Sequence, residues 1–126
     1  MFTHTLGLSY RTDAGTVVNL SEAVTGTNQG VDLDAVISPG AMSSYSVFID
    51  PAKCQSVLLA SDQPTEIKTN DPNTPQHTID LRANIPVAWT INSFWPIPFG
   101  PDNVNAMYIT NNGAVSANVK IRVLSN

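Results

Sequence analysis

The chain has few charged residues, a single cysteine and no long apolar run. Only 13% of its 126 residues are charged, and its six lysines and arginines are scattered along the chain. Proteins that bind nucleic acid use basic clusters to displace counterions, and anionic membrane surfaces attract the same kind of cluster. The composition therefore argues against binding to nucleic acid and against a place on a membrane surface.

The lone cysteine, Cys54, excludes a disulfide within the chain. It lies in an apolar run whose only nearby cation is Lys53, so we expect a buried thiol without a chemical role. No stretch approaches the roughly 18 apolar residues of a membrane span. The N-terminus lacks the basic and apolar regions of a secretory signal, which makes the cytoplasm the expected place of synthesis.

What the chain has instead is a series of short segments in which apolar and polar residues alternate. Successive side chains on a strand point to opposite faces, so this period of two predicts strands. The predicted strands cover residues 2–10, 16–20, 31–37, 44–49, 54–60, 65–69, 78–82, 87–91, 104–110 and 115–124. Residues 25–30 are predicted to form a loop because of their Thr, Gly and Asn content. Only residues 20–24 show a weak helical period.

Eight to ten short strands joined by short turns predict an all-β protein. We expect one antiparallel β-sandwich domain over residues 1–126, with jelly-roll or Greek-key connections. Residues 1–12 are predicted to be an N-terminal arm or an edge strand of this domain. A domain of this length buries about two thirds of its unfolded surface, so it needs no covalent staple.

No group of residues has the spacing of a catalytic or metal-binding motif. The two histidines, His4 and His77, are distant from each other and from Cys54, whereas zinc needs three or four converging ligands. Asp32 and Asp34 share one face of a predicted strand, and paired carboxylates can act in acid–base chemistry or bind calcium. A solvated strand face is the simpler interpretation of this pair.

Two further motifs are also weak. The segment Asn70-Asp71-Pro72-Asn73 offers several oxygens, but it lacks the Gly and the distal Glu of a calcium loop, so we interpret it as a turn. The chain has no Gly-x-Ser-x-Gly nucleophile elbow and no glycine-rich phosphate loop. We expect no enzymatic activity, no metal and no cofactor.

The long connection at residues 92–103 carries four large apolar residues and several prolines. Loops normally run over the surface, so these side chains either plug one end of the sandwich or contact another protein. Aromatic residues are typical interface anchors, and prolines reduce the entropy lost on docking. Together with the apolar face of the first strand, they give the predicted contact residues Phe2, Leu6, Tyr10, Phe94, Trp95, Ile97 and Phe99.

One series of segments stands out for its order along the chain, namely 56–63, 65–71, 78–84, 85–89, 98–99, 107–111 and 121–124. Through these segments, roughly the C-terminal half or more of the chain resembles a family of small virion proteins of tailed bacteriophages. These segments are strand and turn patterns whose order along the chain is more specific than any one of them. The first 40 residues match less clearly, so the resemblance does not say how they contact a neighbour.

The resemblance implies a β-sandwich capsid decoration (cement) protein without catalytic residues. Such a protein is made in the host cytoplasm and lies on the outer surface of the phage head. Its partners are the major capsid protein and its own copies, as a homotrimer or a dimer. Two alternatives stay open, namely a tail, baseplate or fibre-attachment component and a host glycan or receptor binder. A glycan binder would use Trp89 or Trp95 beside Asn92, Asp102 or Asn103.

Overall fold

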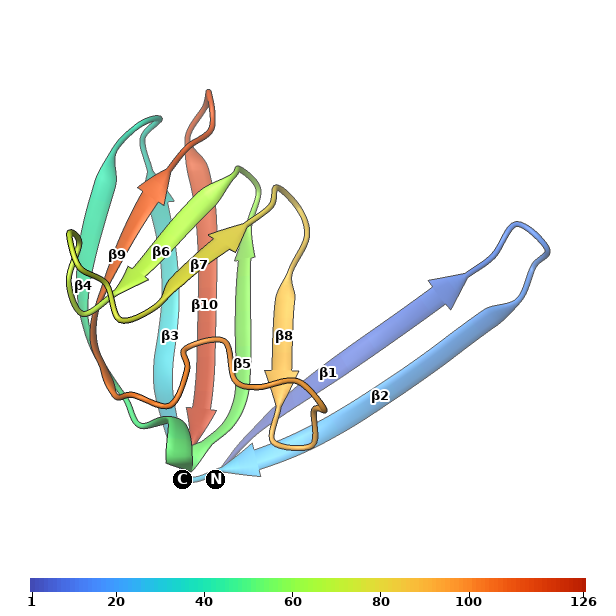
Figure 1. Ribbon diagram of the computed structural model, residues 1–126. Coiled ribbons are helices and arrows are strands. Elements are labelled where there is room, and N and C mark those ends of the chain that lie inside the picture. The colour runs from blue at the N-terminus through green and yellow to red at the C-terminus, as the bar shows by residue number, and fades with distance from the viewer.

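A computed structural model describes all 126 residues, and they form strands, turns and one short 3₁₀ helix (Figure 1). The elements are β1 (Phe2–Arg11), β2 (Val17–Gly26), β3 (Asn28–Ile37), β4 (Met42–Ile49), η1 (Pro51–Lys53), β5 (Cys54–Ser61), β6 (Thr65–Thr69), β7 (Thr78–Leu81), β8 (Val87–Thr90), β9 (Val104–Asn111) and β10 (Ala117–Ser125). None of them is a helix with the length and apolar character needed to cross a membrane.

Eight of the strands form two four-stranded antiparallel sheets, in the orders β3-β10-β5-β8 and β4-β9-β6-β7. The pairing is nested, because β3 pairs with β10, β4 with β9, β5 with β8 and β6 with β7. A long ribbon that pairs in this way and then folds over gives a jelly roll. The predicted all-β sandwich is confirmed, and its connections are of the jelly-roll kind.

The core lies between the inner faces of the two sheets and follows from the period of two. Along β10, Val119, Ile121 and Val123 are buried, while Lys120 between them is exposed. Ile67 on β6 is fully buried, as its alternation predicts. Every buried side-chain N or O atom has a hydrogen-bond partner, so no polar side chain in the core is left unpaired.

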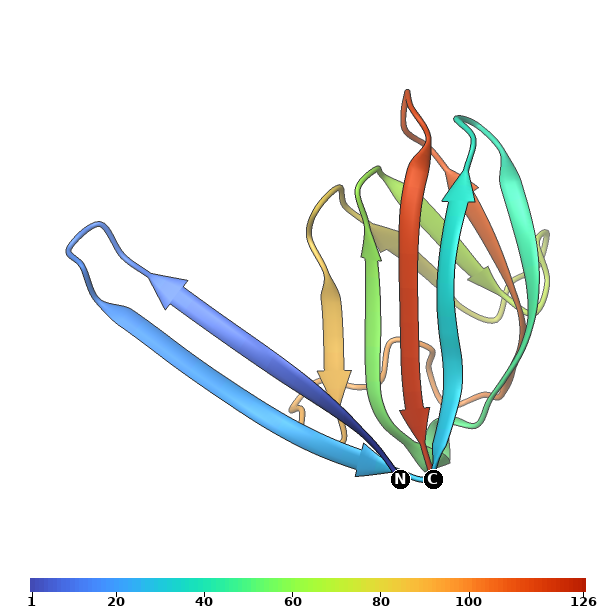
Figure 2. The same ribbon diagram turned by 180° about the vertical axis from the view of Figure 1, so that it is seen from behind.

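Strands β1 and β2 pair only with each other and project from the sandwich as a long hairpin (Figures 1 and 2). We call this hairpin, residues 2–26, the arm. Its strands meet the sandwich near the chain ends, and its tip at residues 12–16 lies far from both sheets (Figure 2). The N-terminal strand is therefore one half of a projecting hairpin rather than an edge of either sheet.

Three details of the sequence prediction are wrong. Residues 25–30 are not a loop, because β2 continues to Gly26 and β3 begins at Asn28. Residues 20–24 are part of β2, so their weak helical period has no structural counterpart. The predicted strand over residues 104–110 ends one residue too early, because Asn111 is the buried last residue of β9.

Candidate interaction surface

The two faces of the arm differ in chemistry. Directly paired residues of an antiparallel ladder point to the same side, so the register assigns each residue to a face. We define the apolar face of the arm as Phe2, His4, Leu6, Leu8 and Tyr10 of β1 with Val18, Leu20, Glu22, Val24 and Gly26 of β2. The opposite face is mainly polar and carries Thr3, Thr5, Ser9, Asn19 and Ser21 among others. A hairpin with one apolar face is expected to pack that face against another protein surface.

The base of the arm packs on the outer face of the β3-β10-β5-β8 sheet. Leu124 of β10 is paired with Ser56 of β5, which is paired with Thr90 of β8, so the three side chains form one row across the sheet. All three are buried although they lie on the outer face of the sandwich. The arm covers this row, so a second, smaller buried region forms between the arm and the outer face of the sheet.

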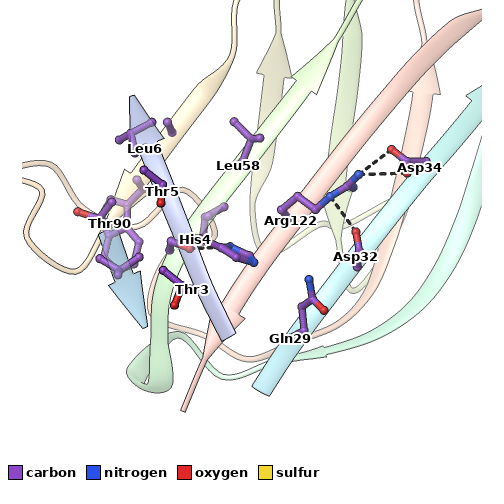
Figure 3. A pocket seen from close by; sticks show the side chains of 15 residues that line it. Thr3, His4, Thr5, Leu6, Gln29, Asp32, Asp34, Leu58, Thr90 and Arg122 are labelled. Carbon is purple, nitrogen blue, oxygen red and sulfur yellow. Dashed lines mark hydrogen bonds and ion pairs between the residues drawn. The ribbon is translucent and has the colours of Figure 1, made fainter. Parts of the chain in front are cut away.

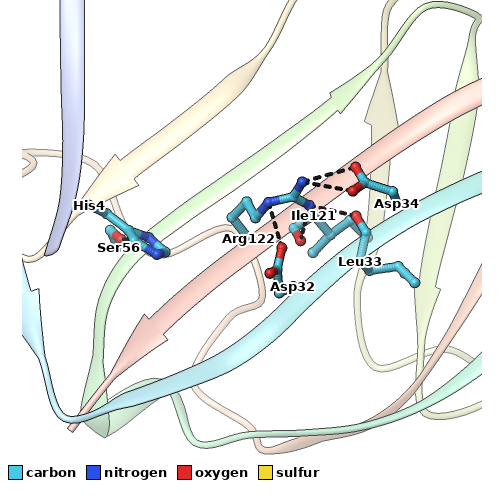
Figure 4. A network of polar contacts seen from close by, with 7 residues as sticks. All are labelled: His4, Asp32, Leu33, Asp34, Ser56, Ile121 and Arg122. Carbon is cyan, nitrogen blue, oxygen red and sulfur yellow. Dashed lines mark hydrogen bonds and ion pairs between the residues drawn. The ribbon is translucent and has the colours of Figure 1, made fainter. Parts of the chain in front are cut away.

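Polar side chains of the arm satisfy the polar members of the row. The ring nitrogen Nδ1 of His4 lies 3.1 Å from Oγ of Ser56 (Figure 4). The Oγ1 hydroxyl of Thr90 donates to both carboxylate oxygens of Glu22, at 3.1 and 3.0 Å, and Asn92 donates to the same carboxylate at 2.6 Å. Hydrogen bonds to a charged group are the stronger kind, so Glu22 fixes the arm where it leaves the sheet.

The arm and the sandwich approach each other closely at Gly26. A Cβ atom at this position would lie 2.5 Å from the backbone oxygen of Ser125 and 2.9 Å from Cγ of Leu124. No real Cβ fits at such distances, so the absence of a side chain lets β2 rest directly on the end of β10. Glycine here serves close backbone packing rather than a turn.

Beyond Glu22 the apolar face has no covering. The cross-strand pairs Leu8–Leu20 and Tyr10–Val18 lie on it, and these side chains are 59%, 62%, 62% and 41% exposed, respectively. We call residues 7–21 the distal arm. Four large apolar side chains on one face of a protruding hairpin are typical of a contact with another protein.

A cleft of about 530 Å³ lies between the base of the arm and the outer face of the sheet (Figure 3). Leu6 lines it from the arm, and Leu58 of β5 and Arg122 of β10 line it from the sheet. Nε of Arg122 lies 2.7 Å from Asp32, and its Nη2 donates to both oxygens of Asp34 at 2.9 and 3.0 Å (Figure 4). The carboxylate pair that suggested acid–base or calcium chemistry is thus held by a guanidinium and joins β3 to β10.

The remaining predicted contact residues lie in the loop after β8, where two of them are buried or partly buried and two are exposed. Phe99 is almost completely buried in the core, and Ile97 packs partly against it, so these two plug one end of the sandwich. Phe94 and Trp95 point outward and are exposed, with Ile91 exposed beside them. Phe99 is therefore removed from the predicted contact surface, whereas Phe94 and Trp95 remain in it.

Several of the residues named for a glycan site have other surroundings in the structure. Trp89 is buried, and its indole N–H donates to the backbone oxygen of Trp95 at 3.0 Å. The side chain of Asn92 is occupied by Glu22. Asp102 and Asn103 line a shallow polar depression whose lining includes no aromatic residue.

The other titratable groups considered in the sequence have structural roles. Burial, with a smaller contribution from the Asp50 carboxylate, raises the pKa of the Cys54 thiol to about 11, so it stays protonated at neutral pH. Backbone N–H groups of Thr74 and Asn73 donate to Asp71 and lower its pKa, as in an ordinary Asx turn. No three His, Cys, Asp or Glu side chains gather in a geometry that could hold a metal ion.

We expect Gly26→Ala to loosen the arm, because the added methyl group collides with the backbone at the end of β10. Overpacking of this kind typically costs about 1–3 kcal/mol. Hydrogen exchange should become faster for the amides of residues 2–6 and 22–26, while those of the sandwich core stay protected. Gly7→Ala is the matched control, since a Cβ at Gly7 meets nothing within 4 Å. Equal exchange in the two variants would contradict the role assigned to Gly26.

Four residues that seat the arm were not singled out from the sequence, namely Glu22, Gly26, Ser56 and Thr90. The alternation in β1 indicated which side of that strand is apolar, but Ser56 and Thr90 are small polar residues that could equally face water. Only the register of β5 with β8 and β10 places them in one row. Comparison of the chain with protein-family models, with curated proteins and with solved structures finds no match.

Proposed function

We propose that the protein is a structural subunit that works by binding neighbouring proteins, as a decoration (cement) protein on the outer surface of a tailed-bacteriophage head. The observation that carries this proposal is that large apolar side chains protrude from a well-packed sandwich at two separate places, the distal arm and the loop after β8. A subunit that holds a lattice together needs at least two such contact surfaces. The resemblance of the C-terminal half to small virion proteins supports the same assignment.

In this proposal the protein binds the major capsid protein after the head has expanded. The exposed side chains of Phe94 and Trp95 contact the capsid, and the arm takes part in contacts between subunits. The copies act together as a homotrimer or dimer, so that several weak contacts become tight through effective concentration. Apolar anchors with a surrounding rim of Thr, Asn and Ser suit the hydrogen-bonded, hydrated interfaces of such assemblies. The mechanism requires no cofactor and no energy source.

The test is to add the purified protein to expanded phage heads that lack it and to measure the bound copies and the melting temperature of the heads. We expect many copies per head and a higher melting temperature. The double variant Phe94→Ser and Trp95→Ser should bind at least ~30-fold more weakly, since the loss of even one central aromatic anchor costs about 2 kcal/mol.

Val115→Ser is the matched control for this experiment, because Val115 is an exposed apolar residue in the turn before β10. It should bind the heads like the original protein. The proposal fails if the unaltered protein neither binds expanded heads nor changes their melting temperature. Binding in only a few copies per particle would instead favour a tail or fibre position.

A further inference from the structure

The distal arm needs a partner that its own chain does not supply. A two-stranded hairpin is marginally stable in water, and it becomes stable when a third layer covers its apolar face. The sandwich covers that face only as far as Leu6 and Glu22. Leu8, Leu20 and Tyr10 continue the same face without any cover. Another surface therefore has to pack against the distal arm.

The cleft beneath the arm indicates the chemistry of the surface that packs against the distal arm. The arm side of the cleft is apolar at Leu6 and continues outward to Leu8 and Leu20. The sheet side is apolar at Leu58 and carries the carboxylates of Asp32 and Asp34, which remain largely exposed although both contact Arg122 (Figure 3). Two carboxylates with one guanidinium leave a net charge of −1. A complementary occupant has an apolar face and, on its other side, a polar face with a positive charge.

The distal arm itself has this pair of faces. Leu8 and Leu20 lie on its apolar side, and Ser9 and Asn19 lie opposite each other on its polar side. Arg11 is also on the polar side, and it is the only lysine or arginine among the first 52 residues. The chain thus contains both the cleft and a segment, the distal arm, whose apolar face matches the arm side of the cleft and whose polar face matches the charged part of the sheet side.

We propose that the cleft receives the distal arm of a second copy of this chain. The two arms pack apolar face against apolar face, and Arg11 of the inserted arm lies toward Asp32 and Asp34. Each copy gives one arm and receives one, so the exchange closes on itself and leaves no unfilled cleft. This inference goes beyond the capsid assignment and does not depend on it.

The proposed contact joins two kinds of surface. The two arms meet through Leu8 and Leu20, which are exposed in a single copy, and the polar side of the inserted arm meets the carboxylates of the sheet. Opposite charges at the rim add orientation and a faster association more than they add affinity.

The experiment measures the mass of the purified protein in solution over a range of concentrations, by light scattering or sedimentation. We expect a closed dimer, because each arm has only one apolar face and can pack face to face with only one other arm. Leu8→Ser combined with Leu20→Ser should raise the dissociation constant at least ~100-fold, because two leucines lose their burial at the contact. Val115→Ser should leave the mass unchanged. Thermal unfolding of each variant shows whether the sandwich itself is intact.

A second variant tests the orientation of the inserted arm without changing its apolar face. Arg11→Asp should weaken the oligomer and make it less sensitive to salt, and Arg11→Lys should restore much of the association. A monomer at every concentration overturns the inference, and so does an oligomer that persists in both arm variants. A monomer that binds phage heads overturns this inference and the proposed homo-oligomer but leaves the capsid assignment standing. An arm-dependent oligomer that does not bind heads contradicts only the capsid assignment.

Discussion

Phe99→Ala should lower the free energy of unfolding by about 3–5 kcal/mol, the usual result of truncating a buried phenylalanine. Only 1% of Phe99 is exposed, and it belongs to the same cluster as Val104 and Met107 of β9. The loop backbone around it is held by a turn in which the N–H of Gly100 donates to the oxygen of Ile97 at 3.1 Å. Because that turn limits how far the loop can collapse, most of the cavity should remain open.

Phe94→Ala is the matched control in the same loop, since Phe94 is fully exposed. Surface substitutions of this kind change stability by less than about 0.5 kcal/mol. Chemical denaturation of the two variants therefore distinguishes the residue that plugs the sandwich from the residue that is free to contact another protein. Similar losses of stability in both variants would mean that the loop does not plug the sandwich in the way described.

The strands of the sandwich could be predicted because burial on one face leaves a period of two in the sequence. Ile67 between Glu66 and Lys68, or Ile121 between Lys120 and Arg122, shows the pattern directly. The loop predicted for residues 25–30 is wrong because this part of the chain does not have one buried and one exposed face. These residues end β2 at the base of the arm and begin the edge strand β3, and their Thr, Gly and Asn content resembles that of a loop.

The candidate interaction surface was predictable only in part. The alternation from Phe2 to Tyr10 identified an apolar face, and this face exists. It could not reveal that the sandwich covers Leu6 and leaves Leu8 exposed, since that boundary depends on where Glu22 meets Thr90, 68 positions further along. Likewise, Phe94 and Phe99 look alike in sequence, and only the path of the loop places one outside and the other inside.

Asn111 illustrates the opposite error, in which a residue typical of turns has a structural role in the interior. It is completely buried, and its Nδ2 donates to the backbone oxygens of Ile37 at 2.9 Å and Val115 at 2.8 Å. Its Oδ1 accepts from the N–H of Gly113 at 2.8 Å. One side chain thereby joins the end of β3 to the turn between β9 and β10.

Asn111→Ala should therefore destabilise the fold by about 2–4 kcal/mol, even though it removes only a small polar group. The substitution leaves the buried carbonyl of Ile37 without its donor, which costs about 1–3 kcal/mol, and it removes two part-buried bonds, to Val115 and Gly113, each worth about 0.5–1.5 kcal/mol. Chemical denaturation measures the loss.

Asn112→Ala is the control for this substitution, because Asn112 is the exposed neighbour in the same turn and should change stability by less than about 0.5 kcal/mol. An equally small effect at Asn111 would mean that water enters this end of the sandwich and replaces the lost bonds. In that case packing and the backbone hydrogen bonds of Asn111 with Gly40 and Ala41 would hold this end of the fold together, and the side-chain hydrogen bonds of Asn111 would contribute nothing measurable to its stability.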